Sequence, residues 1–165
     1  MFHKKTYSVI IITTFLIFFS FICFGKAAFS TQKGKLFLQI VKQPEEKILV
    51  EFRIEKGDCF YLDYTHSSDL TPVHDIFQID KKGIIVLIEE DYLWYGSGLE
   101  FHPEADAKIS FKDNKTRVYL HREFYHFLLR VGRVANHVIT YKEKKIPLKE
   151  IAEGGNLVWI RVIRK

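Results

Sequence analysis

The sequence of 165 residues has little cysteine and no segment of strongly biased composition. Two cysteines exclude a disulfide scaffold and a cysteine-rich zinc site. No internal repeat, low-complexity tract or linker rich in proline and serine divides the chain beyond residue 27. With 47% hydrophobic and 27% charged residues, the composition also excludes a disordered chain, a collagen-like repeat and a polytopic membrane protein. We therefore expect one domain of ordinary size.

The common catalytic and cofactor motifs are missing as well. The chain contains no phosphate-binding loop, no His-Glu-x-x-His motif and no motif of paired cysteines. A Gly-x-Ser-x-Gly nucleophile elbow is also absent, because Gly96-Ser97-Gly98 is too short for that motif. These absences favour a protein that is not an enzyme, with no catalytic residues and no cofactor.

The N-terminus is basic and then strongly apolar. Lys4 and Lys5 precede the uncharged residues 8–24, which are dominated by isoleucine and phenylalanine. This order is typical of an export signal, because the lysines stay on the cytoplasmic side while the apolar segment enters the membrane. Small residues permit cleavage after Ala27, and the apolar segment is also just long enough to span about 30 Å of hydrocarbon as an uncleaved anchor. A buried core helix and a lipid anchor on Cys23 are weaker alternatives.

Much of the positive charge belongs to this first segment. The 25 basic and 20 acidic residues give a net charge of +5, and loss of Lys4, Lys5 and Lys26 with residues 1–27 lowers it to +2. Nucleic-acid binding needs clustered lysine and arginine, so no nucleic-acid partner is expected. We expect the protein at the extracytoplasmic face of the cytoplasmic membrane, or in the periplasm if the signal is cleaved. Cys59 then remains as a single thiol, expected to be buried and inert in an apolar strand.

Residues 36–165 have the periodicity of an all-β domain, which follows a polar spacer at 28–35. Strand-like stretches recur at intervals of roughly 8–12 residues with turns between them, which predicts a single antiparallel sandwich or barrel-like domain. A charged turn is expected at 142–145, and one short helical turn at 147–151. The expected strands are 36–41, 48–54, 59–65, 73–80, 84–88, 109–112, 116–120, 124–131, 137–141 and 157–163, with a helix as an alternative for 124–131.

The most unusual segment is residues 64–75, which carry hydroxyl groups, two imidazoles and two carboxylates. The residues proposed there for a ligand or contact site are Tyr64, His66, Ser67, Asp69, Thr71 and Asp75. Three interpretations remain open. The first is a structured loop, since such polar side chains satisfy backbone groups in turns. The second is a metal site of His66, His74 and Asp75, which are common ligand types. Nucleophilic catalysis is the least favoured, because His66 and Ser67 are neighbours on an extended segment and point to opposite sides.

A second candidate segment contains two glycines around a serine and an adjacent tyrosine. The residues proposed there are Tyr95, Gly96, Ser97 and Gly98. Glycine permits positive φ, so that successive N–H groups can converge on an anion, while the neighbouring aromatic rings can line a pocket. A tight connection between core aromatics is the alternative. Arg117, Arg130 and Arg133 could pair with a carboxylate ligand, although solvated strand faces explain them equally well.

At these two segments the chain resembles a bacterial family catalogued as domain of unknown function eighteen-fifty. Its two hallmark motifs are similar to Tyr64-Thr65-His66-Ser67 with Thr71-Pro72-Val73, and to Tyr95-Gly96-Ser97-Gly98-Leu99. The weaker Arg130-Val131-Gly132 and Ala135-Asn136 also fit, and the resemblance covers roughly residues 36–163. The family pattern has glutamate where this chain has Asp69 and Asp75, and a small residue at Ser97.

The resemblance implies a role but no reaction. Members of this family are small exported or membrane-anchored proteins, often encoded beside TRAP transporters of the TAXI type, which take up organic acids with an extracytoplasmic binding protein. The implied role is that of an accessory protein at the outer face of the membrane, with transporter subunits as partners. A metal- or anion-binding module that acts alone is the alternative, and a hydrolase using Ser67 or Thr71 is a third.

Overall fold

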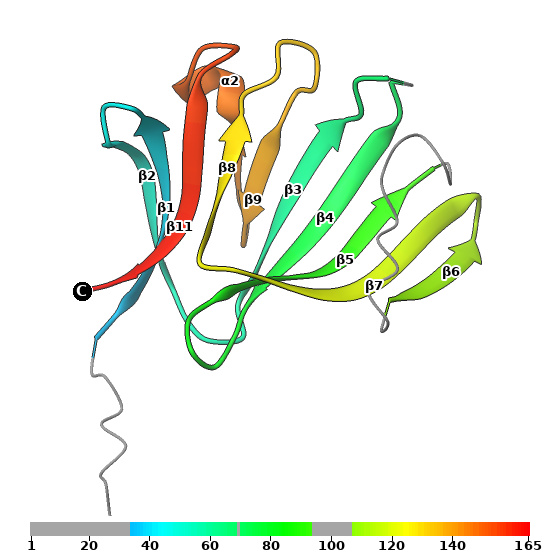
Figure 1. Ribbon diagram of the computed structural model, residues 1–165, viewed down its shortest axis with the longest axis horizontal. Coiled ribbons are helices and arrows are strands. Elements are labelled where there is room, and N and C mark those ends of the chain that lie inside the picture. The colour runs from blue at the N-terminus through cyan, green and yellow to red at the C-terminus, as the bar shows by residue number, and fades with distance from the viewer. Residues whose placement is uncertain (1–33, 69, 94–106) are drawn as a thin grey trace, which may run out of the picture. The chain divides into compact units, whose positions relative to one another are not determined.

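The strands of the chain pair into two antiparallel sheets in the computed structural model (Figure 1). The structure describes residues 34–68, 70–93 and 107–165. Gly34–Lys165 form a compact unit distinct from Met1–Lys33, and the expected export segment lies outside the described residues. In the three described ranges, no helix has the length and apolar character needed to cross a membrane.

The two sheets account for the strands that the structure describes. The four-stranded sheet has the order β2-β1-β11-β8, from β1 (Leu36–Gln43), β2 (Lys47–Ile54), β8 (His126–Arg130) and β11 (Leu157–Arg164). The seven-stranded sheet has the order β10-β9-β3-β4-β5-β7-β6, from β3 (Cys59–Thr65), β4 (Pro72–Ile79), β5 (Ile85–Tyr92), β6 (Lys108–Lys112), β7 (Lys115–Phe124), β9 (Val138–Tyr141) and β10 (Lys144–Pro147). The predicted all-β class is confirmed, and the two sheets are consistent with a sandwich.

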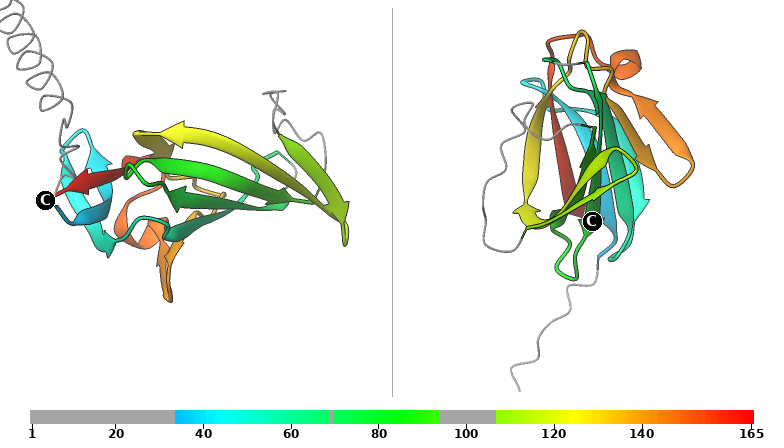
Figure 2. Two further views of the ribbon diagram at one scale, coloured as in Figure 1. Left: turned by 90° about the horizontal axis from the view of Figure 1, so that it is seen from below. Right: turned by 90° about the vertical axis from the view of Figure 1, so that its right-hand side faces the viewer.

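The core lies between the two sheets, which face each other in the right-hand view of Figure 2. Leu38 and Ile160 from the four-stranded sheet belong to the same buried cluster as Phe60 and Phe77 from the other. The Phe77 ring stacks on Phe60 at 4.9 Å within its own sheet and on Phe127 of β8 at 5.1 Å. Each such side chain contributes roughly 1.5–3 kcal/mol by leaving water, so this aromatic stack is a main link between the sheets.

Several local predictions are confirmed, and two need correction. The helical turn is present as α2 (Leu148–Ile151), and residues 124–131 are mostly strand β8 rather than helix. The expected charged turn at 142–145 is wrong in its second half, since Lys144 already begins β10. This strand lies at the edge of its sheet and its lysines are exposed, so it lacks the apolar alternation that would reveal it. Cys59 is half-buried rather than buried; burial nevertheless raises the pKa of its thiol, which keeps it unreactive.

Residues with positive φ form two of the turns between strands. Asp113 and Asn114 have φ of 56° and 57° and join β6 to β7, the positive values that a two-residue hairpin requires. The turn before β5 contains Gly83 at φ 89°. These turns fix the strand register, and with it the face of the sheet on which each side chain lies.

Candidate functional site

A cavity of about 610 Å³ lies where β3 and β8 end, and we call it the strand-end cavity. Its walls come from the end of β3 with the loop after it, from the connection between β8 and β9, and from the turn before β11. The lining residues are Tyr64, Thr65, His66, Ser67, Arg130, Val131, Gly132, Arg133, Val134, Ala135, His137 and Gly155. Two segments that are far apart in the sequence, 64–67 and 130–137, therefore share one cavity.

Backbone hydrogen bonds hold these two segments together. The register of β3 against β9 pairs Asp63 with Val138, and just beyond it the Thr65 N–H donates to the Ala135 carbonyl at 2.7 Å. A Cβ at Gly132 would lie 2.7 Å from the Cβ of Ala135. Only glycine permits that close approach, which shapes the wall of the cavity.

The loop after β3 has the internal bonds of an ordered turn. The His66 N–H donates to the Thr71 carbonyl at 2.8 Å, and the Leu70 N–H donates to the His66 carbonyl at 3.0 Å. The Ser68 hydroxyl lies 2.9 Å from Nδ1 of His66. These bonds support the structured-loop interpretation of this segment. Thr71 does not line the cavity, and Asp69 lies outside the described residues.

His137 belongs to the cavity wall, although it lies in none of the motifs that the sequence analysis singled out. It is only 8% exposed, and the Gly132 N–H donates to its Nδ1 at 3.2 Å, which assigns the ring proton to Nε2. Burial, together with the positive charge of Lys149, lowers the pKa of His137, so the ring is neutral at pH 7. Its ring packs against Tyr64 at 5.6 Å. No local pattern reveals the contact with Tyr64, because it joins separate segments.

Two carboxyl groups are direct cross-strand partners on β4 and β5, one of them buried and the other half-buried. Asp75 faces Glu90, is 7% exposed, and its Oδ1 has no hydrogen-bond partner among the residues that the structure describes. Burial, with the charges of Glu90 and Asp63, raises the pKa of Asp75 to about 8, so this carboxyl is mostly protonated at pH 7. Burial also raises the pKa of Glu90, against the opposing charge of Arg122. The pKa of Tyr64 is raised by burial and by the same two carboxyl groups.

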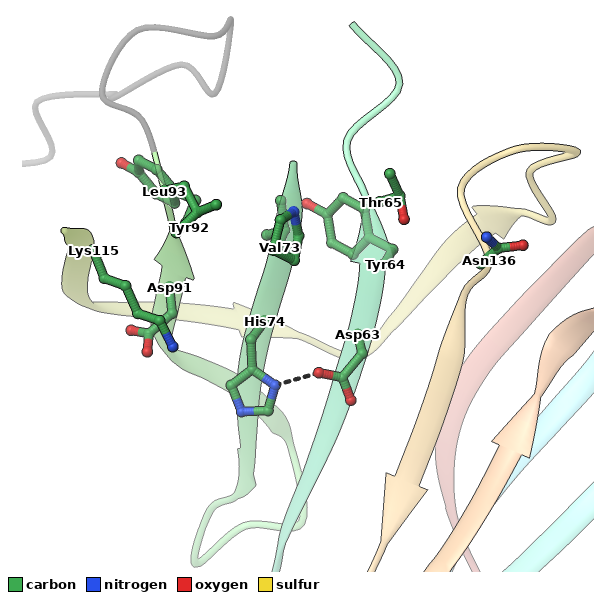
Figure 3. A pocket seen from close by; sticks show the side chains of 11 residues that line it. Asp63, Tyr64, Thr65, Val73, His74, Asp91, Tyr92, Leu93, Lys115 and Asn136 are labelled. Atoms are coloured by element: carbon green, nitrogen blue, oxygen red, sulfur yellow. Dashed lines mark hydrogen bonds and ion pairs between the residues drawn. The ribbon is translucent and has the colours of Figure 1, made fainter. Parts of the chain in front are cut away.

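A second cavity, of about 460 Å³, lies where residues at the ends of β3, β4 and β5 come together (Figure 3). There the Nδ1 of His74 lies 2.6 Å from Oδ1 of Asp63, and the two side chains point toward each other in Figure 3. The next pair in the same cross-strand row is Asp91 with Arg117, whose guanidinium donates to both carboxylate oxygens at 2.8 and 2.9 Å. Acidic and basic side chains thus alternate along this row.

The proposed metal site of His66, His74 and Asp75 does not assemble. Among the residues that the structure describes, no group of three or more His, Cys, Asp or Glu is placed to hold a metal ion. Neighbours in a strand point to opposite faces, so Asp75 is buried in the core while His74 pairs with Asp63 on the other side. His66 lies in the loop that lines the strand-end cavity.

A family model supports the relationship that the motifs suggested. The model described as Domain of unknown function (DUF1850) matches residues 60–148. The chain belongs to this family. The match contains segments 64–67 and 130–137, which line the strand-end cavity, and almost all of the seven-stranded sheet. Comparisons with curated proteins and with solved structures found no match.

The structure separates the predicted site residues into three groups. Tyr64, His66 and Ser67 line the strand-end cavity. Asp75 is buried behind them and lines neither cavity. The second candidate segment, Tyr95, Gly96, Ser97 and Gly98, lies outside the described residues.

Proposed function

We propose that the protein is a non-catalytic accessory protein at the extracytoplasmic side of the cytoplasmic membrane, where it binds a TAXI-type TRAP transporter. The surface around the strand-end cavity is the contact. One observation supports this most strongly: the motif segments 64–67 and 130–136, which carry the family resemblance, line or border the same cavity. The basic and then apolar N-terminus supports export.

The rim of the strand-end cavity has the composition of a contact surface. Val134 is 58% exposed and Leu70, in the loop after β3, is 65% exposed. Val134 lines the cavity with the exposed Arg130 and Arg133, whereas Leu70 lies outside the lining, in the same loop as His66 and Ser67 of the wall. Apolar anchors together with arginine are enriched where proteins meet, and loops on a rigid scaffold are the usual place for such contacts.

Co-purification tests this proposal directly. A tagged full-length chain, extracted from its own membranes in mild detergent, should retain the transporter subunits. The double variant Leu70→Asp with Val134→Asp should reduce their recovery about tenfold or more, because it places two charges in the contact.

The matched control is Tyr125→Asp. Tyr125 is also strongly exposed, but it lies immediately before β8, whereas Arg130 ends that strand. It should leave recovery unchanged. Repeated absence of transporter subunits with the unaltered chain would refute the proposal, and so would equal losses in both variants.

A further inference from the structure

Of the described residues, two arginines and no acidic side chain line the strand-end cavity. Within residues 34–68, 70–93 and 107–165, no carboxylate pairs with Arg130 or Arg133. Arg117 and Arg161, by contrast, pair with Asp91 and Glu46. The cavity therefore carries positive charge that the described part of the protein does not neutralise.

The turn before β11 contacts both arginines, Arg130 through its guanidinium and Arg133 through its aliphatic stem. Nη1 of Arg130 donates to the Gly155 carbonyl at 3.1 Å, which leaves most of its five N–H donors available. The Cγ of Arg133 would lie 2.8 Å from a Cβ at Gly154, so the absence of a side chain there makes room for the arginine stem. A planar guanidinium held in this way matches a carboxylate, which accepts two parallel hydrogen bonds.

The rest of the cavity is largely apolar. Val131, Val134 and Ala135 line it beside the Tyr64 ring, and His137 is neutral at pH 7. The volume of about 610 Å³ lies within the range of small-molecule sites, which combine apolar walls with a few polar groups.

We propose that the strand-end cavity binds a small organic carboxylate, with its carboxyl group on Arg130 and Arg133 and its apolar body against Val134 and the Tyr64 ring. The inference deepens the proposed function and rests on it for the partner, since the ligand would sit at the surface that contacts the transporter. Binding itself is measurable without the transporter.

Calorimetric titration of the full-length chain in mild detergent provides the test. The probes are hexanoate and benzoate, with hexan-1-ol and benzyl alcohol as neutral counterparts that also correct for partition into detergent. The carboxylates should bind at least tenfold more tightly than the alcohols, and more tightly than inorganic phosphate, which has no apolar body.

Variants assign the binding to the cavity. Arg133→Ala should weaken carboxylate binding about tenfold or more, the usual effect of losing a charge-assisted hydrogen bond. Arg133→Lys should recover part of the loss, because it keeps the charge but not the two-pronged geometry. Arg117→Ala, on the other face of the sheet, should leave binding unchanged. Equal urea midpoints for Arg133→Ala and the unaltered chain show that folding is preserved. If the midpoint of Arg133→Ala falls, Val134→Asp is used as the test variant in its place, because its new charge should repel the carboxylate.

The inference is overturned if the carboxylates bind no better than the alcohols or phosphate, or if Arg117→Ala weakens them as much as Arg133→Ala does. Its failure is distinguishable from that of the proposed function. Absent carboxylate binding with intact transporter recovery overturns the ligand alone, whereas carboxylate binding without transporter recovery overturns the partner alone.

Discussion

Buried Asp75 should make the fold less stable as the pH rises. Its pKa is about 8 in the native state, against an ordinary value of 3.8. Between these values the unfolded chain has released the proton and the native chain retains it, so stability falls by about 1.4 kcal/mol per pH unit. The contribution is complete below about pH 4 and is lost as the pH rises through 8. Between pH 5 and pH 8 the loss is roughly 3–4 kcal/mol.

The variant Asp75→Asn isolates this effect. His137 acts in the opposite sense, because its pKa is lowered from 6.5 by burial and by Lys149; its contribution is present above pH 6.5 and is lost as the pH falls. The useful quantity is therefore the difference in unfolding free energy between Asp75→Asn and the unaltered chain, in which the His137 contribution cancels. This difference should grow by roughly 3–4 kcal/mol in favour of the variant from pH 5 to pH 8.

Urea denaturation at pH 5, 6, 7 and 8 measures this difference. With a slope of roughly 2–3 kcal/mol per molar urea, the midpoint of the variant should move upward by about 1–2 M relative to the unaltered chain over this range. Asp91→Asn is the matched control. Hydrogen bonds from Arg117 lower the pKa of Asp91, so this carboxyl is ionised in both states throughout the range and its difference should stay constant. A constant difference for Asp75→Asn would refute the reasoning, as would the same growth in both variants.

Two further predictions concern turns and interstrand contacts, and urea midpoints measure both. Gly57 and Gly83 both have φ of 89°, but a Cβ at Gly83 would lie 3.2 Å from Cδ2 of Leu36 while one at Gly57 would meet nothing within 4 Å. Gly57→Ala should therefore cost about 1 kcal/mol through backbone strain alone, and Gly83→Ala should cost more; equal losses would contradict the packing argument. Tyr141→Phe removes a hydroxyl that lies 2.6 Å from Oδ2 of Asp58 and 3.1 Å from the Arg53 carbonyl. It should lower the free energy of unfolding by about 1–2 kcal/mol, and an unchanged midpoint would show that these bonds are not net stabilising.

Strand positions were predictable where side chains alternate between core and solvent. In β4 the sequence places Val73, Asp75 and Phe77 on one face, and the structure buries all three while His74 and Gln78 are less buried. Prediction was poorer where charge interrupts the pattern. β5 continues through Glu89 to Tyr92, beyond the expected end at 88, because pairing with β4 and β7 holds the strand together. The edge strand β10 was missed for the same reason, since its lysines face solvent.

The candidate site was predictable only in part. Residue types and the family resemblance pointed to Tyr64, His66 and Ser67, which line the strand-end cavity with segment 130–137. Composition alone could not indicate that Asp75 would be buried opposite Glu90 rather than beside His66. The two acids are distant in the sequence, and their proximity follows from the pairing of β4 with β5.

The sequence by itself determined the all-β class, most strand positions and the turns, because side-chain alternation and turn conformation are local properties. Tertiary structure decided which loops meet. β3 pairs with β9 across more than seventy residues of chain, a register that places Thr65 against Ala135 and closes the strand-end cavity. Such pairing depends on how two sheets share one core, and no local stretch of residues encodes it.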